Sequence, residues 1–533
     1  GVGLGLQQCA GDLARLVVPG SHGRNTTWLG VVGLAATIGL IVHRWQRPDL
    51  WATVHFPLLP YLPLLPALWI RCGQRVRNWH ERPRWLINIF PLPLLTATLW
   101  IPTVASDLVR SEGLAGPTVL LLRRAMDDDR DGFSAWLDGG DCDDANATIN
   151  PGAFDTPRDG IDQDCDGTDF KPTKADPSTR FTPLPTTYTP LKNLVFITVD
   201  TLRADRLSWH GGGNDTMPQT QLKLVDRGAA FMRAYANGVR SQRSIPSMVI
   251  GRYPSRLKWG EDGKDAVTVS EDNISLGDIL QKAKFKTHAI IMERYFAKQK
   301  GLTQGWTFHK ARQIQPGYVN WGKSTSKAIT RYTKKMIQRL RNQEDRWAIW
   351  VHYYDPHIRF NRSRFGHDAF ARYDESLATT DEHLGPLLDS INLDDTLVVL
   401  ASDHGQGLGT HGHHGHGSHL YEEDIHVPLV FAGAGLTPKR LQDVVQNIDI
   451  VPTVLNLLDL ANAEAAWDGR SLVPALFGGQ LPPRSAIAEA LPDPHTNDHA
   501  WALVQPSIKL IHDLKRQTQT IYNLDADPQE RAG

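Results

Sequence analysis

Two short runs of apolar, mainly β-branched residues stand out in the pattern of hydrophobic and polar positions. The run Leu194–Val199 is followed directly by Asp200, and the run Leu397–Ser402 by Asp403 and His404. Such continuous apolar runs are typical of strands buried inside a sheet. In an open α/β sheet, functional side chains gather where strands end. We therefore expect these three side chains to meet at one edge, where their oxygen and nitrogen atoms suit a hard divalent metal or zinc.

Three longer apolar stretches in the first 105 residues predict membrane helices, at 28–42, 50–70 and 85–105. The second and third reach the roughly 20 residues needed to cross a bilayer, and the first does so only with help from its flanks. Their many prolines are tolerated where a helix bundle satisfies the freed backbone groups. A proline-rich hairpin buried in a soluble fold is the less favoured interpretation.

The loop between the second and third stretches predicts the orientation. It contains a single acidic residue and five arginines, which are Arg71, Arg75, Arg77, Arg82 and Arg84. By the positive-inside rule this loop is cytoplasmic, so the chain from about residue 106 onward lies across the membrane. We expect a multi-pass protein of the inner (cytoplasmic) membrane whose catalytic domain is periplasmic or extracellular. Because the chain begins with Gly rather than Met, a further N-terminal span or signal is left open.

Length and composition bound the organisation. The 533 residues exceed one ordinary domain. After the membrane stretches the sequence ends in a long alternation of strand and helix patterns, which predicts an α/β sandwich. The expected segments are an N-terminal segment 1–27, membrane helices within 28–105, a juxtamembrane segment 106–126, an Asp-rich module 127–169, a Pro/Thr linker 170–190 and a catalytic domain 191–533.

Charge and cysteine content narrow the possible partners. Lys and Arg number 57 and Asp and Glu 58, so the near-neutral chain gives no reason to expect a nucleic-acid partner. Of the four cysteines, Cys142 and Cys165 lie in the exported half and could pair, whereas Cys72 and Cys9 are expected to be free thiols.

The Asp-rich module has the spacing of a calcium loop. Asp127, Asp129 and Asp131 alternate, Gly132 supplies the sharp turn, and Asp138 falls at the twelfth position of an EF-hand-type loop. Further aspartates follow up to residue 169. The alternative is a solvated acidic linker, since blocks of like charge are usually that. We favour Ca²⁺ as the ligand because Gly and Asp recur at fixed offsets. The segment resembles thrombospondin type 3 repeats and the Asp-rich repeats of bacterial surface proteins.

Five motifs in the C-terminal half resemble successive signatures of the sulfatase family within the alkaline phosphatase superfamily. They are VDTLRADRLSWHG from 199, HYYDPH from 352, SDHGQGLGTHG from 402, HGSHLYEEDIHVPLVF from 416 and IYNLDADPQER from 521. The resemblance implies an alkaline-phosphatase-like α/β/α sandwich. A membrane bundle followed by such a domain is also found in bacterial enzymes that transfer phosphoglycerol or phosphoethanolamine groups.

The same resemblance directs attention to two serines as candidate nucleophiles. The family places its nucleophile at the start of a helix that ends in a GRYP-like turn, here Gly251 to Pro254. Counting back without a gap reaches Ser241, whereas Ser244 imitates the start of the family motif but removes nearly one helical turn. We rank Ser241 first. A serine hydroxyl needs a metal or base to become a strong nucleophile, and either serine could instead cap the helix.

The chain also departs from the family pattern. Sulfatases convert their nucleophile to formylglycine, a modification that reads a Pro and an Arg downstream, and neither serine preserves both. The second family Asp after the first strand is Thr201 here, and the Lys-x-His pair that many sulfatases offer to the sulfate group has no clear counterpart around Lys284 to Phe296. These departures weaken sulfate-ester hydrolysis. They leave phosphoryl transfer by an unmodified serine unaffected.

By resemblance, Asp200, Asp403 and His404 would bind a catalytic divalent metal, which could be Ca²⁺, Mn²⁺, Mg²⁺ or Zn²⁺. His411 also matches a family position and is a further candidate ligand. The other histidines of this glycine-rich loop are expected to be solvated, except for His416.

Three more residues are candidates for contacts with the substrate. His357 and His416 would contact the transferred group or a second metal. Arg243 lies beside the candidate nucleophile, and its planar fork suits a phosphate or sulfate group, although a surface salt bridge is an equal alternative.

These patterns favour a membrane-anchored, metal-dependent enzyme that cleaves or transfers sulfate or phosphate ester groups through a covalent enzyme intermediate. Phosphoryl-type transfer is slightly preferred, and the ester could be lipid-linked or part of a polysaccharide. The alternatives are a sulfuric ester hydrolase with an unusual nucleophile and a catalytically silent surface binding protein.

Overall fold

The computed structural model describes residues 115–151, 153, 155, 159–169, 181–260, 268–291, 301–309, 324–357, 362–460, 467–492, 498–516 and 518–532. All of them belong to the second of two units, Leu99–Gly533. The membrane helices expected within 28–105 and residues 170–180 of the expected linker lie outside the described residues. Among the helices that are described, none is long and apolar enough to cross a bilayer.

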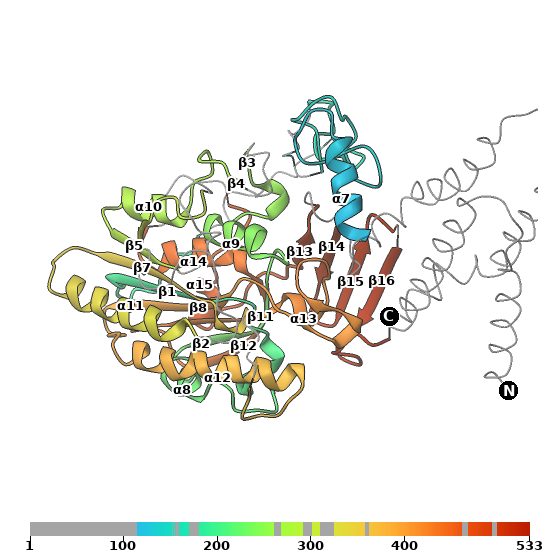
Figure 1. Ribbon diagram of the computed structural model, residues 1–533. Helices are drawn as coiled ribbons and strands as arrows, with labels where there is room; N and C mark the ends of the chain where they lie inside the picture. Colours follow the sequence, from blue (N-terminus) through green and yellow to red (C-terminus); the bar gives the residue numbers. More distant parts are fainter. Residues whose placement is uncertain are drawn as a thin grey trace, which may run out of the picture. The chain divides into compact units, whose positions relative to one another are not determined.

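An eight-stranded sheet organises the catalytic half (Figure 1). All neighbouring strands are parallel except for β11, which runs antiparallel to both β2 and β8. In spatial order the strands are β12 (Lys439–Gln446), β2 (Ala229–Tyr235), β11 (His426–Ala432), β8 (Thr396–Ser402), β1 (Asn193–Val199), β7 (Trp347–Tyr353), β5 (Lys286–Ile290) and β6 (Thr307–His309). The predicted α/β class and the two predicted buried strands, β1 and β8, are confirmed.

Helices cover both faces of this sheet, as Figure 1 shows. One layer contains α9 (Ser241–Ile250), α10 (Leu276–Lys282), α14 (Ile450–Leu457) and α15 (Val473–Leu476), and the other contains α8 (Pro218–Lys223), α11 (Ser326–Arg341) and α12 (Ala369–Leu388). Strand β1 serves both layers because its side chains alternate: Leu194 and Phe196 join one core, and Val195 and Ile197 join the other. Burial on two faces is the reason for the continuous apolar run.

A second, antiparallel sheet follows, formed by β13 (Ala486–Ala490), β14 (Ala500–Val504), β15 (Ile508–Asp513) and β16 (Thr518–Asn523). It is tied to the short helix α13 (Glu422–Ile425) by Lys509, whose buried ammonium lies 3.1 Å from Glu422 and 2.8 Å from Glu530. Two small hairpins complete the described strands, β3 (Trp259–Gly260) with β4 (Thr268–Val269) and β9 (Gly407–Leu408) with β10 (His414–Gly415).

The Asp-rich module follows helix α7 (Ala115–Ala125). A disulfide joins Cys142 to Cys165, with their Cα atoms 5.7 Å apart, which confirms the predicted pairing. The buried Arg123 of α7 donates to the carbonyl oxygens of Leu137 and Asp138, so the helix and the first Asp loop are fastened together.

Candidate active site

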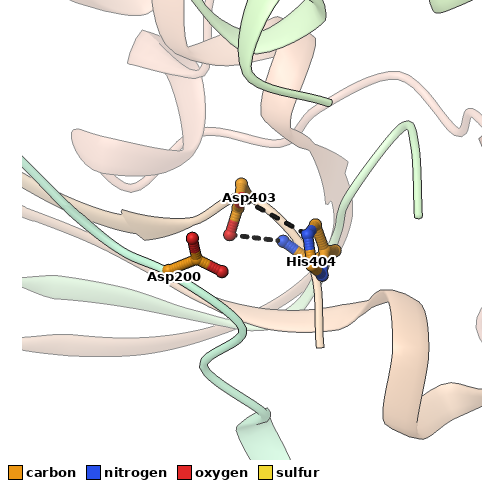
Figure 2. Close-up of side chains that lie close together, drawn as sticks. All are labelled: Asp200, Asp403 and His404. Atoms are coloured by element: carbon orange, nitrogen blue, oxygen red, sulfur yellow. Dashed lines mark hydrogen bonds and ion pairs between the residues drawn. The ribbon is translucent and has the colours of Figure 1, made fainter. Parts of the chain in front are cut away.

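The parallel pairing of β1 with β8 brings two carboxylates to one edge of the sheet. Val199 is opposite Ser402 in the register, so the next residues, Asp200 and Asp403, leave the sheet side by side. Both are almost fully buried, at 1% and 0% exposure. One ligand atom from each of Asp200, Asp403 and His404 lies within 4.8 Å of the others. Figure 2 shows the two carboxylates facing each other with the imidazole beside them.

The turn after β1 fixes the direction of the Asp403 carboxylate. Asp403 Oδ1 accepts from the backbone N–H of Thr201 at 3.1 Å and from that of His404 at 3.0 Å. Thr201 has a φ of 55°, which is rare for a β-branched residue. Such strain persists where surrounding contacts hold it, and here the Tyr373 hydroxyl donates to the Thr201 carbonyl at 2.6 Å.

The remaining donor atoms fit a divalent cation. Asp403 Oδ2 is buried and has no hydrogen-bond donor among the residues that the structure describes. His404 Nδ1 lies 2.8 Å from the Gly405 carbonyl, which can only accept, so Nδ1 carries the proton and Nε2 offers its lone pair. That Nε2 is 3.4 Å from Asp403 Oδ2. Two buried carboxylates and one imidazole nitrogen form a donor set suited to zinc or a harder divalent metal.

A chain of hydrogen bonds supports Asp200 from behind. The Trp350 indole donates to the Thr198 hydroxyl at 3.0 Å, and this hydroxyl lies 2.8 Å from His352 Nδ1. His352 Nε2 then faces Asp200 Oδ2 at 3.4 Å. Partners of this kind orient metal-binding carboxylates and tune their basicity. His352 therefore lies behind the site, where it supports Asp200.

The two candidate serines have different partners. Ser241 is the first residue of α9, and its Oγ lies 3.1 Å from His404 Nε2, beside the metal-binding group. Ser244, one turn further along, is fully buried and donates its hydroxyl to the backbone carbonyl of Asp403. Helix α9 ends at Gly251 with a φ of 79°, as the predicted turn requires. The geometry therefore favours Ser241 as the reactive hydroxyl and gives Ser244 a supporting position.

Two imidazoles, those of His416 and His357, extend the site from His404. The His416 ring lies 4.4 Å from the His404 ring, and its Nε2 is 2.9 Å from His357 Nε2. His357 Nδ1 contacts the Tyr354 hydroxyl at 3.0 Å. Burial, together with the neighbouring imidazoles and Arg240, holds the pKa of His416 well below its usual value. His416 is therefore neutral at physiological pH, with its single ring proton in a position to be shared with His357.

Two predicted site residues have other partners. His411 Nδ1 lies 2.7 Å from Glu423 Oε1, which accepts, and His411 Nε2 lies 3.0 Å from the Glu530 carbonyl oxygen. The ring of His411 stacks on Tyr421. Both ring nitrogens are thus engaged outside the Asp200 group. The Arg243 guanidinium donates to the Pro492 carbonyl at 3.0 Å and lies over the Trp259 ring.

The Asp-rich module contains two loops built alike. Asp127 accepts from the N–H groups of Arg130 and Gly132, and Asp162 accepts in the same way from Asp166 and Gly167. The two glycines have φ values of 101° and 99°, which only Gly adopts readily. Both loops contain a group of carboxylates at metal-binding distance, one formed by Asp127, Asp129 and Asp131 and the other by Asp155, Asp162 and Asp164.

The first loop differs from expectation in one ligand. Asp138 pairs with Lys515 at 2.8 Å instead of joining the group, because positive φ angles at Leu137 and Asp138 turn the chain away. Asp141 lies near the loop in its place. Burial, with nearby carboxylates contributing, raises the pKa of Asp131 to about 7 and that of Asp141 to about 6. One carboxylate oxygen on each of Asp129, Asp131 and Asp141 is buried without a donor among the described residues.

Comparison with known proteins decides the family. The sulfatase family model matches residues 192–460, about half of the chain. The chain belongs to the sulfatase family. A second family model, for a metal-binding motif, matches residues 141–169, which include the second Asp loop.

Curated relatives of this sulfatase-family chain match over short regions. A choline-sulfatase of Rhizobium meliloti is 30% identical over 169 residues, which are 30% of this chain and 31% of that protein. The human N-acetylglucosamine-6-sulfatase is 31% identical, over 22% of each chain. The alkaline phosphatase superfamily protein PehA of Trinickia caryophylli is 40% identical, over 16% of this chain and 17% of that protein. The chain thus matches about a third or less of the length of these relatives, which are hydrolytic enzymes.

Solved structures show the same fold over most of their length. A 2-O GAG sulfatase matches with a TM-score of 0.54 at 18% identity, covering 64% of this chain and 87% of that one. The phosphonate monoester hydrolase of Agrobacterium radiobacter matches with a TM-score of 0.52 at 16% identity, covering 65% of this chain and 91% of that one. The predicted alkaline-phosphatase-like architecture of the catalytic half is confirmed.

We predict that Asp403→Asn weakens divalent metal binding at the sheet edge by about tenfold or more, because it removes the charge of a buried ligand without changing its shape. The measurement is metal content per protein after dialysis against limiting metal. Asp381→Asn is the matched control, since this carboxylate is equally buried but accepts from Gln219 and Thr220 in α8. Equal metal content in both variants would contradict the assignment.

Proposed function

We propose that this sulfatase-family chain is a metal-dependent enzyme that cleaves or transfers ester groups with Ser241 as nucleophile. The observation that carries the proposal is the 3.1 Å contact of Ser241 Oγ with His404 Nε2, next to the buried pair Asp200 and Asp403. A nucleophile, a metal-binding set and a pair of proton-carrying histidines lie together, as a covalent displacement mechanism requires.

The residues divide the chemistry between them. A divalent metal bound by Asp200, Asp403 and His404 would lower the pKa of a bound hydroxyl and neutralise charge on the ester. Ser241 attacks the phosphorus or sulfur atom, and the bond to the leaving oxygen breaks. The N-terminus of the ten-residue helix α9 favours the negative charge at Ser241. Water or an acceptor hydroxyl then displaces Ser241, which regains its proton.

His416 and His357 take up the proton that Ser241 loses as it attacks, and the imidazolium so formed donates this proton to the leaving oxygen. They share one short contact between their Nε2 atoms, and His357 is held in turn by Tyr354. His416 is the nearer of the two to His404. We assign the proton transfer to His416 and the positioning of its ring to His357.

Phosphoryl-type transfer is the preferred reaction, because an unmodified serine attacks phosphorus directly and the sequence around Ser241 lacks the pattern read by formylglycine formation. Sulfate-ester hydrolysis is the second candidate, favoured by the names of the curated relatives, which include choline-sulfatase. The two reactions would use the same residues and differ in the group transferred.

The placement of the domain and the ligand of the Asp-rich module are further parts of the proposal. The arginine-rich loop at 71–84 supports a membrane-anchored chain whose catalytic half lies on the periplasmic or extracellular side. Protease added to spheroplasts, whose periplasmic face is open, should then remove a C-terminal tag. Protection of the tag until the spheroplasts are lysed would refute this placement. The donor-free carboxylate oxygens of the module support Ca²⁺, which binds to clustered carboxylates in such loops.

We predict that Ser241→Ala lowers turnover of the preferred substrate by about 10³-fold or more, because no other hydroxyl lies at His404 Nε2 among the described residues. The full chain is assayed on matched aryl sulfate, phosphate monoester and phosphodiester substrates. Ser247→Ala is the control within the same helix, since its hydroxyl bonds only to the Arg252 carbonyl. If turnover is lost in Ser244→Ala and retained in Ser241→Ala, Ser244 is the nucleophile. If the metal-loaded wild type shows no turnover, the alternative of a catalytically silent binding protein is favoured.

We predict that His416→Gln has an effect that depends on the leaving group. Esters with a poorly acidic leaving alcohol should slow by about 10²- to 10⁴-fold, because their leaving oxygen needs a proton in the transition state. A nitrophenyl ester should slow much less, since nitrophenolate leaves unprotonated. The measurement is the slope of log kcat/KM against leaving-group pKa, and an unchanged slope would remove His416 from the role of acid.

We predict that Asp131→Asn weakens Ca²⁺ binding by the full chain by about tenfold or more, because it removes one of three clustered carboxylates. Isothermal titration after chelation provides the measurement. Asp138→Asn is the matched control and should retain binding, since Asp138 pairs with Lys515. If Asp138→Asn abolished Ca²⁺ binding and Asp131→Asn did not, Asp138 would be a Ca²⁺ ligand, as the EF-hand-type spacing predicts.

A further inference from the structure

A basic groove lies between α11 and α12. Figure 1 shows these two helices in the layer that contains α8. The volume of the groove is about 710 Å³. Its lining residues include no carboxylate and no Phe, Tyr or Trp ring, but there are five cationic side chains, Lys327, Arg331, Lys334, Lys335 and Arg341. A groove lined by one sign of charge concentrates ligands of the opposite sign.

The cationic side chains form a stripe along one side of α11. Arg331 follows Lys327 by four positions, Lys334 and Lys335 follow Arg331 by three and four, and Arg341 follows Lys334 by seven, or two helical turns. This spacing places them on one helix face, and the helix contains no acidic residue. From Lys327 to Arg341 the stripe is about 21 Å long at 1.5 Å per residue. The apolar residues of α11, Ile329, Met336 and Leu340, face the core instead.

Most of these charges are not neutralised by the protein. Lys327, Lys334, Lys335 and Arg341 have no ion-pair partner in the part of the chain that the structure describes. Neighbouring acids are already engaged: Arg364 pairs with Glu375 and Glu382, and Lys223 pairs with Asp389. Leaving several like charges side by side without counter-charges is unfavourable unless an external anion balances them.

The stripe begins next to the candidate active site. The cap of α11 is held by Asp355, which accepts from the Thr325 N–H at 2.7 Å and from the Ser326 hydroxyl at 2.7 Å. Asp355 opens the short helix Asp355–His357, so His357 of the site is two residues away. A long ligand with one ester group at Ser241 therefore has a cationic track on which to continue.

We propose that this groove binds a linear polyanionic polysaccharide, which is a glycan with repeated sulfate, phosphate or carboxylate groups. This glycan would be the substrate class of the proposed enzyme, so the inference rests on the proposed function. Regularly spaced cations over about 21 Å match a repeated anion better than a single one. Apart from the His383 imidazole, the lining residues offer no aromatic ring on which bases could stack, which disfavours single-stranded nucleic acid. The only lining aliphatic of the stripe, Ile337, is buried, which disfavours insertion into a bilayer.

The test is a binding measurement on the full chain carrying Ser241→Ala, so that its outcome does not depend on turnover. The probes are a heparin oligosaccharide, neutral dextran of equal length, single-stranded DNA and vesicles containing phosphatidylserine. We expect heparin binding that Lys334→Glu with Lys335→Glu weakens at least tenfold at physiological salt. The same pair should reduce the slope of log K against log salt by about two.

The matched control is Lys258→Glu with Lys282→Glu, two exposed lysines outside the groove that carry the same change of charge. It should alter heparin affinity less than twofold. Equal weakening by both pairs, or none by either, would overturn the proposal, and so would tighter variant-sensitive binding of DNA or vesicles than of heparin. In the Ser241-intact chain, the groove pair should retain turnover of a small aryl ester. If the small ester is never turned over but heparin binding still depends on the groove, the catalytic proposal fails and the binding site stands.

Discussion

The pairing of β1 with β8 is the constraint on which the site depends. Because the two strands are parallel and in register up to Val199 and Ser402, the two following aspartates must leave the sheet together. Both strands lie in the centre of the sheet with cores on each face, so neither carboxylate can turn to solvent. Placing two buried carboxylates side by side is costly unless a cation joins them. The fold therefore creates an anionic position, and a divalent metal satisfies it.

The parts around this position are held by backbone contacts more than by side-chain pairs. Thr201 and His404 direct their N–H groups at Asp403, and the hydroxyl of Ser244 binds the Asp403 carbonyl. The helix that presents Ser241 is thereby connected to the strand that presents the metal ligands. A change at Ser244 would move both groups, which explains why a serine resembling the family motif need not be the nucleophile.

The Asp-rich module repeats the same physics outside the catalytic domain. Its aspartates are brought together by tight turns at Gly132 and Gly167, and burial raises the pKa of several of them. The α11 stripe is the opposite case, because Lys327, Lys334, Lys335 and Arg341 have no ion-pair partner among the described residues. In both places the protein's own charges are unbalanced, and the sign of the imbalance indicates the kind of ligand.

The sequence alone determined the strands β1 and β8 and the polar residues at their ends, because these follow from local hydrophobic periodicity and turn residues, whereas the helix that begins at Ser241 was implied by the resemblance to the sulfatase family. The sequence also indicated that Cys142 and Cys165 could pair, which the structure confirms. Only the tertiary structure placed Ser241 and not Ser244 at His404 Nε2, turned His411 to Glu423, took Arg243 to Trp259 and brought Asp141 instead of Asp138 near the first Asp loop. Each of these depends on where a side chain points within a turn and on partners remote in the chain. The spacing of residues along the sequence predicts neither the direction of a side chain nor its remote partners. A few positive φ angles are enough to redirect a side chain to a different neighbour.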